Sequence, residues 1–329
     1  MRPPDFWNSS DGEFAARALA PIAWAWVAAG RVRRALARPW RAPAKVLCVG
    51  NLVAGGAGKT PLALELARRI LARGHAVHFL TRGYGGRAVG PLRVDPETHG
   101  FAEVGDEALL LARVAPTWVG ADRVGLARAA CAAGARVLVM DDGFQNPALA
   151  KDWSVVVVDG ANGFGNGRVM PAGPLREPIA DGLKRAGAVV IVGPDEKGAA
   201  EQIAAGRPDL PVLRARVVPG ADAARLKGRA VFAFAGIGRP DKFFATAAAA
   251  GALVRETAAF PDHHPFTAGE IEDLQRRAAR LGAMPLTTAK DAARLSLGAR
   301  GAIEVLTMDL AWENEASLDT LLDSVLRAP

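Results

Sequence analysis

The chain has 329 residues, of which 50% are hydrophobic and 23% are charged, and its net charge is +7. This length suggests about two domains, and the apolar fraction excludes a chain with long disordered stretches. Because the basic residues are spread through predicted helices with no zinc-finger or RNA-recognition signature, the charge indicates an anionic substrate or an anionic lipid surface and no nucleic acid.

The first 44 residues form a distinct segment. Residues 18–30 carry no charge and contain Trp24 and Trp26, and they precede a group of arginines. This run is shorter than the roughly 20 residues that span a bilayer, and acidic residues before it argue against a signal peptide. The pattern predicts an amphipathic helix in the headgroup region of a membrane, and a helix packed on its own domain is the alternative. The arginines are Arg31, Arg33, Arg34, Arg38 and Arg41.

A glycine-rich turn follows an apolar strand predicted at residues 45–49 and precedes a predicted helix. If this is a phosphate-binding loop, backbone N–H groups of the turn would bind phosphate oxygens, Lys59 would reach the β- and γ-phosphates of a nucleotide, and the Thr60 hydroxyl would hold Mg²⁺. Strict spacing requires glycine at position 53, where this chain has Val53, so a purely structural turn is the alternative. The predicted nucleotide-binding residues are Gly55, Gly56, Ala57, Gly58, Lys59 and Thr60.

Apolar strands then alternate with helices such as residues 122–133, which predicts a parallel sheet with helices on both faces. The strands are expected at residues 75–81, 136–140, 154–159 and 188–192. We therefore expect an α/β fold in which residues 45–220 form a P-loop NTPase-like domain.

After a lapse of the apolar pattern at residues 219–228, a second, smaller α/β domain is expected at residues 221–329. Strands and helices alternate through it, and its apolar runs are again short and bounded by turn residues. The expected strands are residues 230–235, 253–258, 284–287 and 303–308, and the expected helices are residues 240–250, 267–281 and 317–326.

Polar residues follow the predicted strands, at the sheet edge where ligands bind in such folds. Asp141 and Asp142 come after four apolar residues, as does the Walker-B carboxylate that meets Mg²⁺. Asp106 and Glu107 stand before a helix and are either an N-terminal capping pair or a base near the phosphates. The Gly- and Pro-rich segment 163–178 carries Arg176, a candidate phosphate ligand.

Together these motifs resemble the tetraacyldisaccharide 4'-kinase family of lipid A biosynthesis. The resemblance extends from about residue 13 to about residue 295 in the family's order, and it accounts for Val53, because the family's loop has the form Gly-Asn-x-x-x-Gly-Gly-x-Gly-Lys-Thr. The motifs are residues 50–61, 82–85, 105–107, 141–145 and 171–178, with 236–238, 243–244 and 262–263 in the second half.

The resemblance implies an ATP-dependent kinase that uses Mg²⁺ and phosphorylates the 4'-hydroxyl of a tetraacylated glucosamine disaccharide 1-phosphate. Such an enzyme is expected at the cytoplasmic face of the inner membrane of a Gram-negative-type bacterium. The N-terminal helix would then meet the membrane that holds the acyl chains of the substrate, and no obligate protein partner is implied.

Roles follow from the resemblance together with the chemistry of phosphoryl transfer. Lys59 and Arg176 are expected to face the transferring phosphate, with Mg²⁺ on Thr60 and Asp142, and Asp141 is the alternative carboxylate for the metal. Asp106 is expected to accept the proton of the sugar hydroxyl, and His263 to orient or tune it from the other domain, so that the pair forms when the domains meet. Further positions that match the family are Glu107, Arg123, Asp141, Asp142 and Glu177.

Two positions depart from the family pattern, since Asn146 stands where His is usual and Ala289 where Glu is usual, which puts roles at these positions in doubt. Another P-loop kinase or a nucleotide-switch ATPase would share the phosphate loop, although such switches have lysine where this chain has Ala54. A non-enzymatic, nucleotide-gated binding protein is the remaining alternative.

Cys48 and Cys131 lie in apolar segments and are expected to be reduced, buried thiols.

Overall fold

The computed structural model describes residues 4–7, 13–55 and 58–327. The chain forms two compact units, each assembled from separate stretches of sequence. Unit 1 comprises Met1–Arg82, Ala121–Arg216 and Ala311–Pro329, and unit 2 comprises Gly83–Gly120 and Val217–Leu310. The chain passes from unit 1 to unit 2 after Arg216, close to the domain boundary expected near residue 220. The segment Gly83–Gly120 was expected in the nucleotide-binding domain but belongs to unit 2.

The N-terminal segment of unit 1 is helical, with η1 (Asp5–Trp7), α1 (Glu13–Ala18) and α2 (Ala20–Leu36). Proline in the first turn favours the start of α2, and the extended conformation of Ala37, two residues before Pro39, ends it. Trp24 and Trp26 are exposed, and Ala23 is buried. No helix among the described residues is both long and apolar enough to cross a bilayer.

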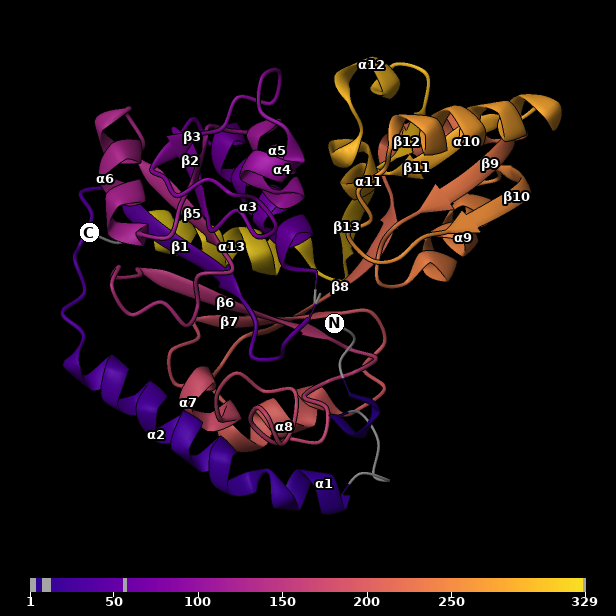
Figure 1. The fold of residues 1–329 in the computed structure, drawn as a ribbon. Helices are drawn as coiled ribbons and strands as arrows, with labels where there is room; N and C mark the ends of the chain where they lie inside the picture. The colour runs from indigo at the N-terminus through magenta and orange to yellow at the C-terminus, as the bar shows by residue number, and fades with distance from the viewer. Residues whose placement is uncertain (1–3, 8–12, 56–57, 328–329) are drawn as a thin grey trace. The chain divides into compact units, whose positions relative to one another are not determined.

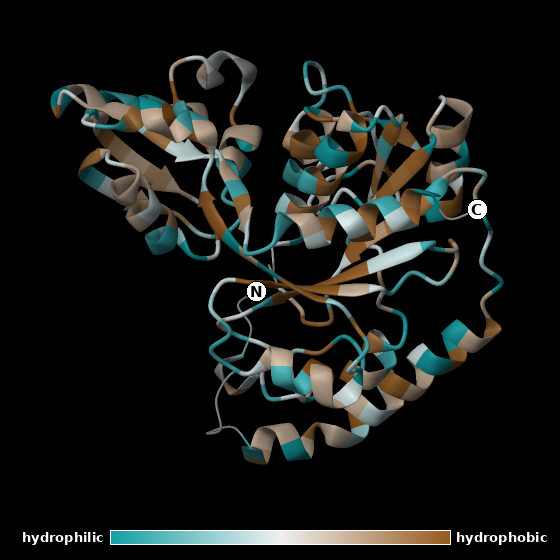
Figure 2. Cartoon of the chain, turned by 180° about the vertical axis from the view of Figure 1, so that it is seen from behind, coloured by the Kyte–Doolittle hydropathy of each residue, from teal (hydrophilic) through white to brown (hydrophobic). Residues whose placement is uncertain are grey.

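A sheet of largely parallel strands forms the centre of unit 1 (Figure 1). All five residues of several strands are buried, which explains why their sequences are mostly apolar, drawn brown in Figure 2. Across the sheet the order is β13 (Met308–Trp312), β8 (Val212–Pro219), β7 (Ala188–Val192), β6 (Trp153–Asp159), β1 (Lys45–Gly50), β5 (Val137–Asp141) and β2 (Val77–Thr81).

Helices cover both faces of this sheet. On one face α3 (Lys59–Ala72) lies beside α13 (Glu315–Arg327), and α7 (Ile179–Leu183) and α8 (Ala199–Gly206) cover the other (Figure 1). Arg73, the residue that follows the last turn of α3, binds Asp319 and Asp323 of α13, each at 2.7 Å. The helix α6 (Arg123–Ala132) begins at Asp122, whose side chain accepts a hydrogen bond from the backbone N–H of Val124.

Unit 2 contains a four-stranded parallel sheet with a helix on each face. Alternate residues of its central strand β9 (Ala230–Ala235) point to opposite faces, so that Ala233 packs with Phe243 of α9 and Phe234 packs with Ile271 of α10. The strand order is β10 (Leu253–Ala259), β9, β11 (Met284–Thr288) and β12 (Glu304–Leu306), and the helices of this region are η3 (Ala221–Leu226), α9 (Pro240–Ala249), α10 (Ala268–Arg280), α11 (Ala289–Arg294) and α12 (Leu297–Arg300).

The segment Gly83–Gly120 joins unit 2 through an apolar contact between two helices. Ala108 and Leu109 of α5 pack with Ala293 of α11 in one buried cluster. Burial of these side chains accounts for the difference from the expected contiguous domains. The segment comprises β3 (Leu92–Arg93), α4 (Phe101–Val104), α5 (Asp106–Ala112) and β4 (Thr117–Val119).

The predicted α/β class is confirmed, with local differences. The strand expected at residues 303–308 is interrupted, because the Thr307 hydroxyl donates to Asp222 Oδ1 at 2.6 Å and its carbonyl accepts from the Gly220 N–H at 2.9 Å. The chain therefore leaves β12 at Leu306 and begins β13 at Met308. Asp106, expected to precede a helix, opens the first turn of α5.

Candidate active site

The phosphate loop connects β1 to α3 in unit 1. Gly50 lies against Phe144, and a Cβ there would be 2.4 Å from the Cβ of Phe144, so only glycine fits. Gly55 and Gly58 have φ values of +120° and +85°, a conformation that side chains disfavour. These glycines direct the chain into the N-terminus of α3, where backbone N–H groups favour anions. Gly56 and Ala57, also predicted to bind nucleotide, lie outside the described residues.

Strand pairing brings the end of β5 to this loop. Val49 of β1 is in register with Asp141 of β5, and the Thr60 hydroxyl lies 3.2 Å from Asp141 Oδ2 with both side chains buried. Hydroxyl and carboxylate oxygens are the donors that Mg²⁺ prefers, so this pair fits the ion. Of the two carboxylates that the sequence leaves open as its ligand, Asp141 is the one that contacts Thr60. The described residues contain no group of three or more His, Cys, Asp or Glu arranged to hold a metal.

Asp142 faces two cations. Arg176 binds it with both terminal nitrogens, Nη1 to Oδ1 at 2.9 Å and Nη2 to Oδ2 at 3.2 Å, and Lys59 Nζ is 3.7 Å from Oδ1. Burial acts to raise the pKa of Asp142, but Lys59 and Arg176 outweigh it and lower the pKa. We call Lys59, Thr60, Asp141, Asp142 and Arg176 the phosphate cluster.

Backbone hydrogen bonds hold Arg176 beside the phosphate loop. The N–H of Arg176 donates to the Leu52 carbonyl at 2.7 Å, and the N–H of Ala54 donates to the Pro174 carbonyl at 2.8 Å. Val53 and Leu175 form an antiparallel bridge between these bonds. The position that breaks the strict glycine spacing thus joins the loop to the segment that carries Arg176.

Glu177 is buried behind Arg176 and binds several partners. Gln145 Nε2 donates to Glu177 Oε1 at 3.1 Å and to the Asn51 carbonyl at 2.9 Å, and Arg185 donates to Oε2 at 2.5 Å. Gln145 belongs to the motif after β5, but its link to Glu177 was not predicted, because it depends on the path of a later loop. Through Gln145, Glu177 therefore connects the segment that carries Arg176 to the loops after β1 and β5.

Arg123 lies in the first turn of α6 and is buried. Its Nη1 donates to the Thr81 carbonyl at 3.3 Å. Burial and the nearby Arg82 lower its pKa, against the opposite effect of Asp142 and Asp141. This cation therefore adds positive potential next to the phosphate cluster.

Unit 2 holds a second polar group, formed by Asp106, His263 and Arg294, which we call the Asp106 triad. His263 Nδ1 lies 3.2 Å from Asp106 Oδ2, and Arg294 Nε donates to the same oxygen at 2.9 Å. Arg294 also binds the Gly236 carbonyl and Asp291. The predicted pairing of Asp106 with His263 is present, but the expectation that it joins two domains is wrong, because both residues belong to unit 2.

The triad keeps Asp106 ionised. Burial acts to raise the pKa of Asp106, and the hydrogen bond from His263 and the charges of Arg294 and Lys290 outweigh it and lower the pKa well below its usual range. The same hydrogen bond raises the pKa of His263, which burial opposes. Beside Asp106, Glu107 forms an ion pair with Lys290 at 2.9 Å.

One residue of the phosphate cluster and one of the triad have an uncommon backbone conformation. Among the described residues, the non-glycine positions with positive φ are Asp142 at +54° and His263 at +59°. Such conformations are sparsely populated and concentrate where function fixes a side chain. Arg294 was not predicted, and its one sequence signal is its place one turn after Asp291.

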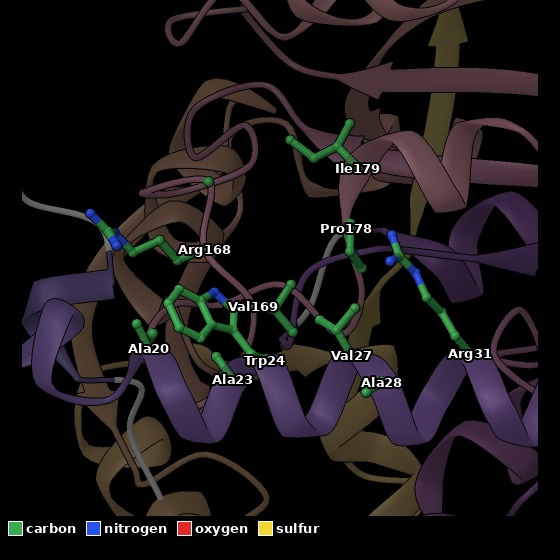
Figure 3. Close-up of a pocket in the computed structure, with 12 residues that line it drawn as sticks. Ala20, Ala23, Trp24, Val27, Ala28, Arg31, Arg168, Val169, Pro178 and Ile179 are labelled. Carbon is green, nitrogen blue, oxygen red and sulfur yellow. The ribbon is translucent and has the colours of Figure 1, made fainter.

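An apolar groove of about 660 Å³ lies between α2 and two stretches on either side of Arg176, residues 167–172 and 178–179. Figure 3 shows Trp24, Val27 and Arg31 pointing from α2 towards Val169 and Pro178. Arg31 binds Asp181 with two nitrogens, at 2.8 and 3.1 Å. The groove combines apolar walls with an exposed cation, as lipid-facing surfaces do.

Comparison with known proteins gives one consistent relationship. The family described as tetraacyldisaccharide-1-P 4'-kinase, LpxK, matches residues 15–327. A tetraacyldisaccharide 4'-kinase from Rhodospirillum centenum is 56% identical over 330 residues, which cover 99% of this chain and 97% of the relative. One from Paramagnetospirillum magneticum is 52% identical over 327 residues, 99% of each chain. The crystal structure of LpxK from Aquifex aeolicus, described as an "apo" form in complex with ATP, has a TM-score of 0.75 and 26% identity, covering 95% of this chain and 99% of the other.

Proposed function

Because the chain belongs to the tetraacyldisaccharide-1-P 4'-kinase family, we propose that it transfers the γ-phosphate of ATP to the 4'-hydroxyl of a tetraacylated glucosamine disaccharide 1-phosphate. The observation that carries this proposal in the chain's own structure is the phosphate cluster, in which Lys59 and Arg176 flank Asp142 at the start of α3. Two cations beside a helix N-terminus suit a polyphosphate.

The phosphate cluster stabilises the charge of the transferring group. In the reaction the bond between the γ-phosphorus and the oxygen bridging to the β-phosphate breaks, and a bond from the 4'-oxygen to the γ-phosphorus forms. Lys59 and Arg176 would leave Asp142 to bind the phosphate oxygens, whose charge is spread over the group in the transition state. Mg²⁺, held by Thr60 and Asp141, would supply further charge neutralisation there.

Asp106 is the group that would take the proton of the 4'-hydroxyl. Its Oδ2 binds His263 and Arg294, whereas its Oδ1 accepts a hydrogen bond from the backbone N–H of Glu107 at 2.9 Å. A carboxylate oxygen has about two acceptor sites, so Oδ1 can also accept the hydroxyl. Because the pKa of Asp106 is low, it orients the hydroxyl first and receives its proton late, when bonding to phosphorus has made that oxygen acidic.

The N-terminal helix would bring the enzyme to its lipid substrate. Trp24 and Trp26 on α2, the arginines that follow them, and the apolar groove support association with an anionic bilayer surface as a peripheral protein. We expect the full chain to sediment with phosphatidylglycerol vesicles, and its recovery in the supernatant would contradict the association. The cytoplasmic face of an inner membrane is the proposed location, because ATP is the donor.

The kinase assignment is tested with labelled ATP, Mg²⁺ and the tetraacyl disaccharide 1-phosphate in detergent micelles. Transfer of the γ-label to the lipid is expected, and the same lipid already phosphorylated at the 4'-position is the matched control that should take no label. Release of labelled inorganic phosphate with unlabelled lipid would instead support a nucleotide-switch ATPase. ATP binding with neither product would support a nucleotide-gated binding protein.

A further inference from the structure

One stripe of α2 binds the segment that carries Arg176. Trp26 Nε1 donates to the Arg176 carbonyl at 3.1 Å, Arg33 Nη2 donates to the Gln145 carbonyl at 3.1 Å, and Arg34 Nη1 lies 3.3 Å from Glu177 Oε2. These three side chains stand at positions i, i+7 and i+8, which share one face of a helix. The helix with membrane-surface character is therefore joined to the loops behind the phosphate cluster.

The same loops determine where the Arg176 guanidinium lies. Arg176 reaches Asp142 with two nitrogens, and Gln145 Oε1 is 3.4 Å from Arg176 Nη1. Gln145 in turn donates to Glu177. A continuous series of hydrogen bonds and ion pairs thus runs from Arg34 through Glu177 and Gln145 to Arg176.

Burial strengthens the electrostatic interaction between Arg34 and Glu177. The Glu177 side chain is 3% exposed and that of Arg34 is 20% exposed, so water screens this pair poorly. Arg185 is the second cation on Glu177. Loss of Arg34 would remove one of these two cations and leave Glu177 bound by Arg185 and Gln145, which shifts the adjacent Arg176.

We infer that Trp26 and Arg34 of α2 are positioning residues for phosphoryl transfer, which hold Arg176 in the orientation that neutralises the transferring phosphate. This rests on the proposed kinase function. The helix then has two separable roles, one in association with lipid and one in the rate of the chemical step. A displacement of about 1 Å at a reacting group can cost up to about a hundredfold in rate, so small shifts of Arg176 matter.

The test compares four variants of the full chain in the micellar kinase assay. Arg34→Gln removes the ion pairs with Glu177 and Asp181, Arg34→Lys keeps the charge, and Trp26→Phe keeps an aromatic ring but removes the N–H donor. Arg17→Gln is the matched control, because Arg17 is an exposed cation on α1 whose recorded ion pair is with Glu13. We measure kcat, the KM for ATP, sedimentation with phosphatidylglycerol vesicles, and the thermal unfolding midpoint.

We expect Arg34→Gln to lower kcat about tenfold with little change in the KM for ATP, Arg34→Lys to recover part of it, and Trp26→Phe to lower kcat about threefold. Vesicle sedimentation of Arg34→Gln should match that of Arg17→Gln. Equal kcat values for Arg34→Gln and Arg17→Gln, or a loss that follows vesicle binding alone, would overturn the inference. If Arg34→Gln does not fold, an unchanged kcat of Trp26→Phe overturns it. Absence of activity in the unsubstituted chain would instead reject the proposed function.

Discussion

The phosphate cluster of unit 1 and the Asp106 triad of unit 2 differ in how far water reaches the arginine–aspartate pair of each. Arg176 and Asp142 expose 25% and 35% of their side chains, whereas Arg294 and Asp106 expose 1% and 3%. Exposed pairs contribute little to stability and exchange partners easily, and a buried pair is costly to break. The phosphate cluster is thus suited to exchange its internal pair for a substrate phosphate, and the triad to keep one charge in a fixed place.

The largest effect is expected from Lys59→Ala in the phosphate cluster. The substitution removes a cation that would act on the transferring phosphate, so kcat/KM for ATP should fall about a thousandfold. The micellar kinase assay measures this, with Lys184→Ala as a control that removes an exposed lysine of unit 1. A loss of less than about tenfold would show that Lys59 does not contact the phosphates in the transition state.

Removing the arginine of each group should lower the free energy of unfolding by different amounts. Arg294→Met leaves the Asp106 carboxylate buried without its guanidinium partner and should lower the free energy of unfolding by about 3 kcal/mol. Arg176→Met breaks a partly exposed pair and should lower it by less than about 1 kcal/mol. Urea denaturation measures both, with hydrogen exchange assigning the loss to unit 2. Equal losses would mean that the difference in burial has no energetic consequence.

Asp106→Asn tests the triad's chemical role. The amide keeps the shape of the carboxylate but cannot take a proton, so kcat should fall about a hundredfold while the KM for ATP changes little. Glu103→Gln on the neighbouring helix α4 is the control, because Glu103 is exposed. A large rise in the KM for ATP with an unchanged kcat would assign Asp106 to nucleotide binding instead.

The position of the phosphate loop beside Asp141 and Asp142 follows from local sequence signals. The glycine-rich loop, Asp141 and Asp142 each follow a short apolar strand, and parallel strands place such ends together. Arg294 reaches Asp106 from 188 residues away, and no periodicity signals this contact. The membership of Gly83–Gly120 in unit 2 was missed for the same reason, since it depends on burial between α5 and α11. Family resemblance supplied His263, which its own sequence context does not.

The smallest expected effect is the pH dependence of the triad. The folded pKa of His263 is raised above its unfolded value of about 6.5, so its contribution to stability is fully present below that value and is lost as pH rises through the folded pKa. The Asp106 contribution is constant in this range, because its pKa is lowered and its contribution is lost only when pH falls below about 4.

The excess unfolding free energy of the unsubstituted chain over His263→Gln should therefore shrink between pH 6 and pH 9. The change should stay below about 1 kcal/mol, because the His263 side chain is 42% exposed. An excess that grows with pH, measured by urea denaturation, would mean that His263 is held neutral and that Arg294 and Lys290 keep Asp106 ionised without it.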